Sequence, residues 1–155
     1  MAKEQPITID GKSEEKSWLI ANELRDFIQW FPTDSLKATN KTNVKIIRDK
    51  ENIYLLIKSS ISSKNYVIES LRRDWGGRGL DGVSFIFDTF NDKTNGYFFG
   101  VSPAGTQRES LVFNGGNEFG RDTDNSWDVK WESESQVYDE YFLSEVKIPI
   151  KFLNF

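Results

Sequence analysis

Short segments with alternating apolar side chains recur along the 155 residues, and turn-forming residues separate them. The clearest is residues 83–88, where Val83, Phe85 and Phe87 recur at every second position, the period of a pleated strand. Many short strands at regular spacing, without long helical periods, are typical of two antiparallel sheets packed face to face. The sequence therefore predicts an all-β fold, an antiparallel β-sandwich with minimal helix.

Nine strands are expected, and aromatic residues at 14% of the chain favour them further. The clearest hairpin joins residues 42–48 to 53–58 through an Asp-Lys-Glu-Asn turn. One helical turn at residues 13–18 is expected to place Trp18 in the core. The other expected strands are 6–11, 26–32, 83–88, 97–102, 109–113, 128–133 and 138–148. Expected core residues include Leu55, Ile57, Phe85, Phe87 and Val146.

The length indicates one domain over residues 1–155. The apolar residues 148–155 have the composition of a packed segment, so we expect an N-terminal piece of a longer protein. The net charge of −4 argues against nucleic acid, which is bound by neutralising its phosphates. No run of 18 apolar residues is present, so we expect no helix that spans a bilayer.

The chain contains no histidine and no cysteine. This composition excludes the common neutral-pH proton shuttle, the thiolate nucleophile and every Cys/His zinc arrangement. Paired carboxylates could still hydrolyse a glycoside, but no pattern in the sequence identifies two of them across a cleft. We therefore expect a protein that binds rather than an enzyme.

Trp75 stands on a loop, Arg72 to Gly79, that is rich in arginine and glycine. Its ring could offer a flat face to a sugar, or it could pack over the edge of the sandwich. Arg73 and Arg78 could donate bidentate hydrogen bonds to hydroxyls or to a carboxylated sugar, or could pair with nearby acids. The remaining tryptophans lie in or beside apolar patterns and are expected to pack in the core or at its edge: Trp18, Trp30, Trp127 and Trp131.

Calcium is the one metal that the remaining side chains suit, because two turns, residues 88–92 and 122–128, are rich in oxygen ligands. The second turn lacks the central glycine and the final glutamate of an EF-hand loop. Acidic turns are also commonly just solvated, so both interpretations stay open. The candidate metal ligands are Asp88, Asp92, Asp122, Asp124 and Asp128.

Taken together, several segments resemble the family 9 carbohydrate-binding module, a β-sandwich related to DOMON-type domains. These segments are Ile9-Asp10-Gly11 with Trp18, Val44-Lys45-Ile46 with Asn52 to Leu55, Asp81 to Asp88, and Glu145 to Pro149. The likeness is greatest to the subgroup found at the N-terminus of large outer-membrane β-barrel-type proteins of unknown function. Its features here are Phe27-x-Gln29-x-x-Pro32, Arg72-Arg73-Asp74, Asp88-Thr89-Phe90-x-Asp92, Ser102-Pro103-x-Gly105-x-Gln107, Ser126-Trp127-Asp128-x-x-Trp131 and Ile148 to Phe155.

The resemblance implies a jelly-roll-like sandwich that binds a glycan end without catalysis and carries structural calcium. In sugar-binding members, two tryptophans sandwich the terminal sugar and polar strand residues hold its hydroxyls. Trp75 matches the first tryptophan, and the second belongs to a segment beyond residue 155. Ser84 stands where a glutamate is expected, and an arginine and an asparagine fall at about Gly100 and Ser102. The implied ligand-binding residues are Trp75, Arg73, Arg78, Ser84 and Ser102.

The resemblance also implies where the protein works and with what. We expect a glycan ligand and, as a partner, the C-terminal membrane region of the parent protein. The expected location is the cell envelope, outer membrane-associated or periplasmic or extracellular, with a link to carbohydrate breakdown. The alternative is a structural or protein-interaction module that keeps the fold and has lost the sugar site. A haem-binding DOMON relative is disfavoured, because the chain has no histidine and Met1 is the only thioether ligand that it offers to haem iron.

Overall fold

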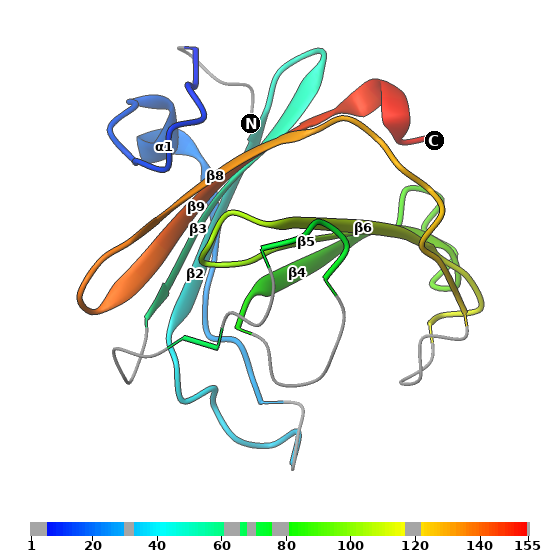
Figure 1. Ribbon diagram of the computed structural model, residues 1–155, viewed down its shortest axis with the longest axis horizontal. Coiled ribbons are helices and arrows are strands. Elements are labelled where there is room, and N and C mark those ends of the chain that lie inside the picture. The colour runs from blue at the N-terminus through cyan, green and yellow to red at the C-terminus, as the bar shows by residue number, and fades with distance from the viewer. Residues whose placement is uncertain are drawn as a thin grey trace.

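The computed structural model describes residues 6–29, 33–60, 66–67, 71–75, 81–116 and 122–154. Over these residues the chain forms two antiparallel sheets, which confirms the predicted β-sandwich (Figure 1). The five-stranded sheet has the order β1 (Asn22–Leu24), β2 (Thr42–Arg48), β3 (Asn52–Ser60), β9 (Tyr141–Pro149), β8 (Glu132–Val137). The four-stranded sheet has the order β4 (Val83–Phe87), β5 (Gly96–Val101), β6 (Gln107–Val112), β7 (Thr123–Asp124). The described helices are short: α1 (Ser17–Ile20) and the 3-10 turn η1 (Ile150–Phe152).

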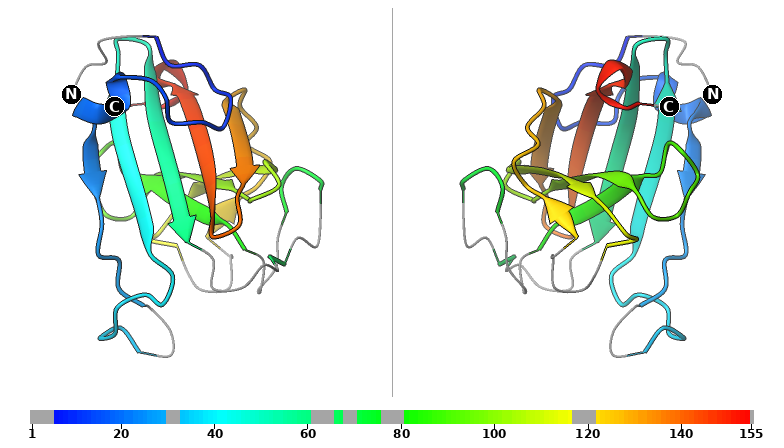
Figure 2. Two further views of the ribbon diagram at one scale, coloured as in Figure 1. Left: turned by 90° about the vertical axis from the view of Figure 1, so that its left-hand side faces the viewer. Right: turned by 90° about the vertical axis from the view of Figure 1, so that its right-hand side faces the viewer.

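The main core lies between the two sheets, whose strands run at a clear angle to each other (Figure 2). Leu55, Ile57 and Val146 are buried there as predicted, and they meet Phe99 from the opposite sheet. Phe85 and Phe87 are half-buried, because β4 is an edge strand of its sheet. Phe85 still stacks on Phe99, with ring centroids 5.8 Å apart.

A second apolar cluster covers the other face of the five-stranded sheet. The N-terminal segment with α1 lies in front of that sheet in the left view of Figure 2, while the four-stranded sheet lies behind it. Ile7 and Trp18 from this segment pack on Ile47, Leu56 and Leu143 of the sheet. Trp18 is 1% exposed, which confirms its predicted place in the core.

A buried carboxylate, Glu145 of β9, fixes the N-terminal segment to this sheet. Its Oε2 accepts hydrogen bonds from the backbone N–H groups of Asp10 (2.9 Å) and Gly11 (3.0 Å), and its Oε1 accepts one from Trp18 Nε1 (3.0 Å). Burial raises the pKa of Glu145 to about 7, and the nearby carboxylate of Glu15 contributes in the same direction. The three N–H donors oppose this shift without cancelling it.

Several predicted strands are wrong in place or kind. Residues 6–11 form no strand in the ladder, because the amides of Asp10 and Gly11 bond to a side chain instead. Asp26 has a φ of 59°, which ends the extended path there, and Ile28 forms just one isolated bridge, with Lys37. The rest of that predicted strand, residues 30–32 with Trp30, lies outside the described residues.

The predicted strands at 128–133 and 138–148 both begin later than expected. β8 starts at Glu132, because the preceding residues turn inward and bury Trp131. β9 starts at Tyr141, after a turn in which the N–H of Tyr138 donates to the carbonyl of Tyr141 (2.8 Å). β1 and β7 were not expected, and both are edge strands of three residues or fewer.

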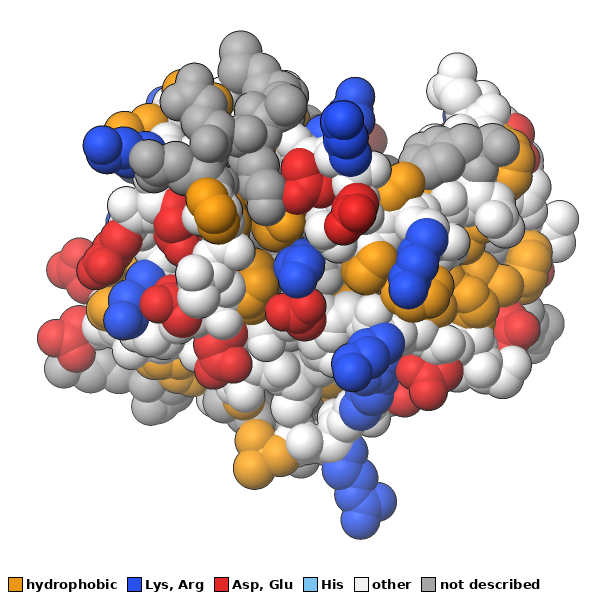
Figure 3. Space-filling view, turned by 90° about the horizontal axis from the view of Figure 1, so that it is seen from above, with side chains coloured by type: hydrophobic (Ala, Val, Ile, Leu, Met, Phe, Trp, Pro, Cys, Tyr) orange, Lys and Arg blue, Asp and Glu red, His pale blue; other side chains and the backbone are white. Residues whose placement is uncertain are grey.

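The surface seen from above carries acidic and basic side chains interspersed with apolar ones (Figure 3). No extended area of one charge sign stands out among the described residues of that face. No helix in the described part of the chain has both the length and the apolar character needed to cross a membrane.

Candidate functional site

The face of the four-stranded sheet that points away from the core carries the candidate site. Side chains in register on neighbouring strands share a face. Phe85, Phe99 and Glu109 are in register and face the core, so the alternate positions face outward. We call the surface formed by these alternate positions the outer face; its residues are Ser84, Ile86, Phe98, Gly100, Arg108 and Ser110.

Trp75 lies on the outer face against two glycines. A Cβ atom added at Gly82 would lie 3.0 Å from Cη2 of Trp75, and one added at Gly100 would lie 3.4 Å from its Cζ2. The indole Nε1 donates to the carbonyl of Thr106 (3.2 Å), so the polar edge of the ring is anchored. The ring is half-buried, and the two glycines let it approach the backbone of the sheet.

Three side chains converge above Gly100. The Cβ position at this glycine would lie 3.2 Å from Oγ of Ser84 and 3.6 Å from Cε1 of Phe98, in addition to the contact with Trp75. On the next strand, the guanidinium of Arg108 lies over Phe98, with Cζ 5.1 Å from the ring centroid. The outer face thus combines two aromatic rings, a hydroxyl and a cation, which suits stacking on a sugar and hydrogen bonding to its substituents.

Two of the five predicted ligand residues, Trp75 and Ser84, therefore meet on the outer face. Sequence reasoning missed Phe98 and Arg108. Tyr97, Phe98 and Phe99 are consecutive aromatic residues, so the local sequence does not show which of them faces outward. The strand pairing places Phe98 on the face opposite Phe99. Arg108 joins them through the pairing of β5 with β6, a register that the local pattern does not contain.

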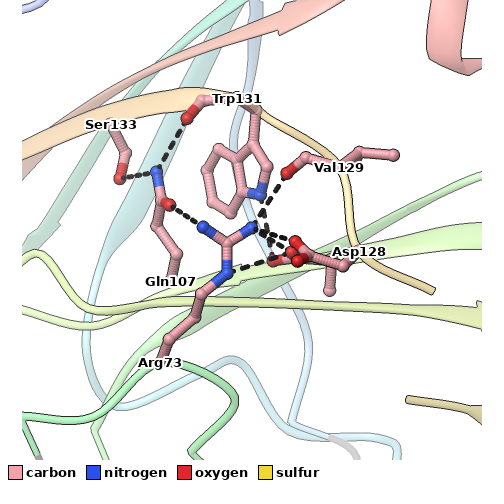
Figure 4. A network of polar contacts seen from close by, with 7 residues as sticks. Arg73, Gln107, Asp128, Val129, Trp131 and Ser133 are labelled. Carbon is pink, nitrogen blue, oxygen red and sulfur yellow. Dashed lines mark hydrogen bonds and ion pairs between the residues drawn. The ribbon is translucent and has the colours of Figure 1, made fainter. Parts of the chain in front are cut away.

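Arg73 lies elsewhere, in a network at the edge of the core (Figure 4). Its Nε donates to Oε1 of Glu109 (3.1 Å), and its Nη2 pairs with the same carboxylate. The guanidinium also donates to Asp128 Oδ1 (3.1 Å) and to the carbonyl of Val129 (2.8 Å). Nη1 donates to Oε1 of Gln107 (3.1 Å). Arg73 therefore holds the loop that carries Trp75 against β6.

Glu109, the partner of Arg73, is 1% exposed. Burial raises its pKa, while the bonds from Arg73 and from Trp131 Nε1 (3.0 Å) act in the opposite direction. The predicted pairing of the loop arginines with acids is thus observed for Arg73, although the partners are Glu109 and Asp128 instead of the acids adjacent in sequence.

Ser102 and Arg78 complete the predicted ligand set. The buried hydroxyl of Ser102 is 2.5 Å from Oγ1 of Thr106 and accepts the N–H groups of Ala104 and Thr106, both at 3.2 Å. It shapes the turn that leads into β6, and it is not part of the group around Gly100. Arg78 lies outside the described residues.

Three of the predicted calcium ligands, Asp88, Asp92 and Asp124, accept hydrogen bonds within their own turns. Asp88 accepts the N–H groups of Asp92 (3.1 Å) and Lys93 (2.9 Å), and Asp92 accepts those of Thr94 and Asn95, both at 2.8 Å. These bonds, with that from the Asn95 side chain first among them, lower the pKa of Asp92. Asp124 accepts the N–H of Ser126 (2.9 Å), and Asp128 pairs with Arg73.

No group of three or more acidic side chains gathers in the described part of the chain. The calcium prediction stays a prediction, which a chelator tests directly.

A polar pocket of about 370 Å³ lies beside Gly82 and is lined in part by β2 and β3 of the other sheet. Hydroxyl and amide side chains contribute much of its lining, among them Thr42, Ser59 and Tyr66. Gly82 thus borders both this pocket and the ring of Trp75.

The chain matches no family model and no curated protein. Its fold is similar to a solved carbohydrate-binding module of family 9 (CBM9) from Caldicellulosiruptor kristjanssonii in complex with glucose, with a TM-score of 0.62 and 13% identity over 96% of this chain and 66% of that chain. A second such structure, in complex with cellotriose, gives a TM-score of 0.60 and 14% identity over 96% of this chain and 65% of that chain. The matched part is about two thirds of the length of those chains. The comparison therefore confirms the predicted resemblance at the level of the fold.

Proposed function

We propose that this chain is a non-catalytic carbohydrate-binding module and that Trp75 stacks on a glycan end at the outer face. One observation carries the proposal: the ring of Trp75 lies half-exposed across Gly82 and Gly100, beside the hydroxyl of Ser84. The bond from Nε1 to Thr106 holds the ring in place before any ligand arrives. Such preorganisation lowers the entropy lost on binding.

The similarity in fold supports this proposal, because the two neighbouring structures contain glucose and cellotriose. The outer face also differs from the sugar site that the resemblance implies. Ser84 and Gly100 replace a glutamate and an arginine, and Phe98 supplies a second aromatic ring. We therefore expect a ligand that stacks on an aromatic platform with few hydrogen bonds from the strands.

A glycan array followed by calorimetric titration tests the proposal. Trp75→Ala is expected to weaken binding of any glycan found by at least tenfold, about 1.4 kcal/mol. Phe90→Ala is the matched control, since Phe90 is an exposed aromatic in the turn after β4 and not on the outer face. The proposal fails if no glycan binds, or if the affinity is the same in the Trp75→Ala variant.

The alternative function, a structural or protein-interaction module, has one observation in its favour. Phe27, Ile28 and Leu36 are exposed on two chain segments that bond to each other, through Gln29 N–H to Leu36 carbonyl (2.7 Å) and Ala38 N–H to Phe27 carbonyl (3.0 Å). Ile28→Ser with Leu36→Ser would abolish association with the rest of the parent protein under this alternative. The same double variant leaves glycan binding unchanged under the leading proposal.

We further propose that the chain is the N-terminal module of a larger outer-membrane β-barrel-type protein. In that case it works in the cell envelope, on the outer membrane or in the periplasmic or extracellular space, beside the membrane region of its parent. The motifs shared with that subgroup support this location. Fractionation of the source cells, with immunodetection of this domain, is expected to find it in the envelope fraction.

A further inference from the structure

Arg108 lies on the outer face with its charged group uncommitted. It is in register with Gly100, the glycine on which Trp75 rests, and its guanidinium stacks over Phe98. Within the described part of the chain, the guanidinium of Arg108 makes no hydrogen bond and no ion pair, whereas that of Arg73 is tied to Glu109 and Asp128. Stacking on a ring leaves the edge of a guanidinium, with its N–H donors, available to a ligand.

Among the described residues, the strands of the outer face carry no acidic side chain that could neutralise Arg108. None of its six residues is acidic. Glu109, the acid next to Arg108 in sequence, points to the opposite face and is committed to Arg73. At Ser84, where the resemblance predicts a glutamate, a hydroxyl stands, so no carboxylate at that position repels an anionic ligand. The described part of the outer face is therefore cationic.

We infer that the glycan recognised by the outer face is acidic, and that Arg108 binds the carboxylate of a uronic acid residue. This inference rests on the proposed function and adds the class of ligand to it. A carboxylate matches the planar fork of a guanidinium in a bidentate way, which a neutral hydroxymethyl group cannot do.

The spacing of the strands supports contact with both groups at once. Gly100 and Arg108 lie on neighbouring strands, whose separation is about 4.8 Å. Trp75 reaches over Gly100, so a sugar ring that contacts Trp75 has its substituents within reach of the long side chain of Arg108. The aromatic ring binds the apolar face of the sugar, and the guanidinium selects the acid group.

A pair of matched ligands tests the inference: cellotriose and the same trisaccharide with each C6 oxidised to a carboxylate. Calorimetry at low ionic strength is expected to give at least tenfold tighter binding of the acidic trisaccharide. Arg108→Gln is expected to bring the affinity for the acidic trisaccharide within about twofold of that for cellotriose in the same variant. Arg48→Gln, at the end of β2 in the other sheet, is the control and keeps the preference. Arg108→Lys keeps the charge without the fork and is expected to retain part of the preference.

The outcomes separate this inference from the function on which it rests. Loss of binding of both trisaccharides in Trp75→Ala, with loss of the acid preference in Arg108→Gln, agrees with the inference and with the proposed function. Equal or tighter binding of cellotriose by the wild-type chain overturns the acid preference and leaves carbohydrate binding in place. If a sulfated trisaccharide binds as tightly as the carboxylated one, the assignment of a carboxylate is overturned. If neither trisaccharide nor any other glycan binds, the inference and the proposed function both fail.

Discussion

Replacement of Glu145 by glutamine is expected to remove a pH dependence from the stability of the fold. Glu145 is fully buried, and its pKa rises from 4.5 to about 7. The folded chain therefore holds a proton between these two pH values that the unfolded chain releases. Stability is then greatest below about pH 4.5 and decreases as the pH rises through 7. The gap between the two pKa values corresponds to at most about 3 kcal/mol of unfolding free energy.

Urea unfolding measures how the contribution of Glu145 to stability depends on pH. The wild-type chain and the Glu145→Gln variant are compared at several pH values from 4.5 to 8. The quantity of interest is the difference in unfolding free energy between the two chains at each pH, because carboxylates that do not interact with Glu145 contribute equally to both. We expect the wild type to lose up to about 3 kcal/mol relative to the variant across this range. Glu140→Gln, in the exposed turn before β9, is expected to run parallel to the wild type. Parallel curves for wild type and Glu145→Gln, or a difference of opposite sign, would refute the argument.

Three further predictions test other parts of the structure. Arg73→Ala leaves the buried Glu109 without its cation and is expected to lower the unfolding free energy by about 2 kcal/mol or more. This is at the low end for a buried pair because the Arg73 side chain is 39% exposed. A loss below about 0.5 kcal/mol contradicts the expectation. Trp18→Ala is expected to lower the unfolding free energy by the roughly 3–5 kcal/mol typical of a core tryptophan, and Trp75→Ala by distinctly less. Urea unfolding measures both losses, and equal losses would place Trp75 in the core. If calcium is structural, saturating chelator lowers the melting temperature of the wild-type chain, and an unchanged temperature after confirmed metal removal rules it out. The wild type is the right test because Asp88→Asn and Asp92→Asn also disturb their turns.

The sequence predicts the parts of the fold that local patterns determine. The hairpin of residues 42–58 and the buried Trp18 agree with the structure, since alternation and turn residues act over a few positions.

What the sequence does not predict depends on contacts between distant segments. The N–H groups of residues 10 and 11 bond to Glu145, 135 and 134 residues away, which removes them from any strand ladder. Arg73 meets Glu109 across 36 residues, so its structural role is invisible locally. Arg108 reaches the outer face by the register of β5 with β6, and a shift by one residue would turn it inward.

The central claim is that a glycan binds on the outer face beside Trp75. The most direct measurement is a heteronuclear NMR titration of the isotope-labelled chain with cellotriose and with its C6-carboxylated form. The account predicts the largest shift changes at the Trp75 indole N–H and at the backbone amides of Ser84, Gly100 and Arg108. Leu56 and Leu143, under the N-terminal segment on the other sheet, are expected to stay unchanged. Changes confined to the pocket lined by Thr42 and Ser59, or no changes with either ligand, would contradict the claim.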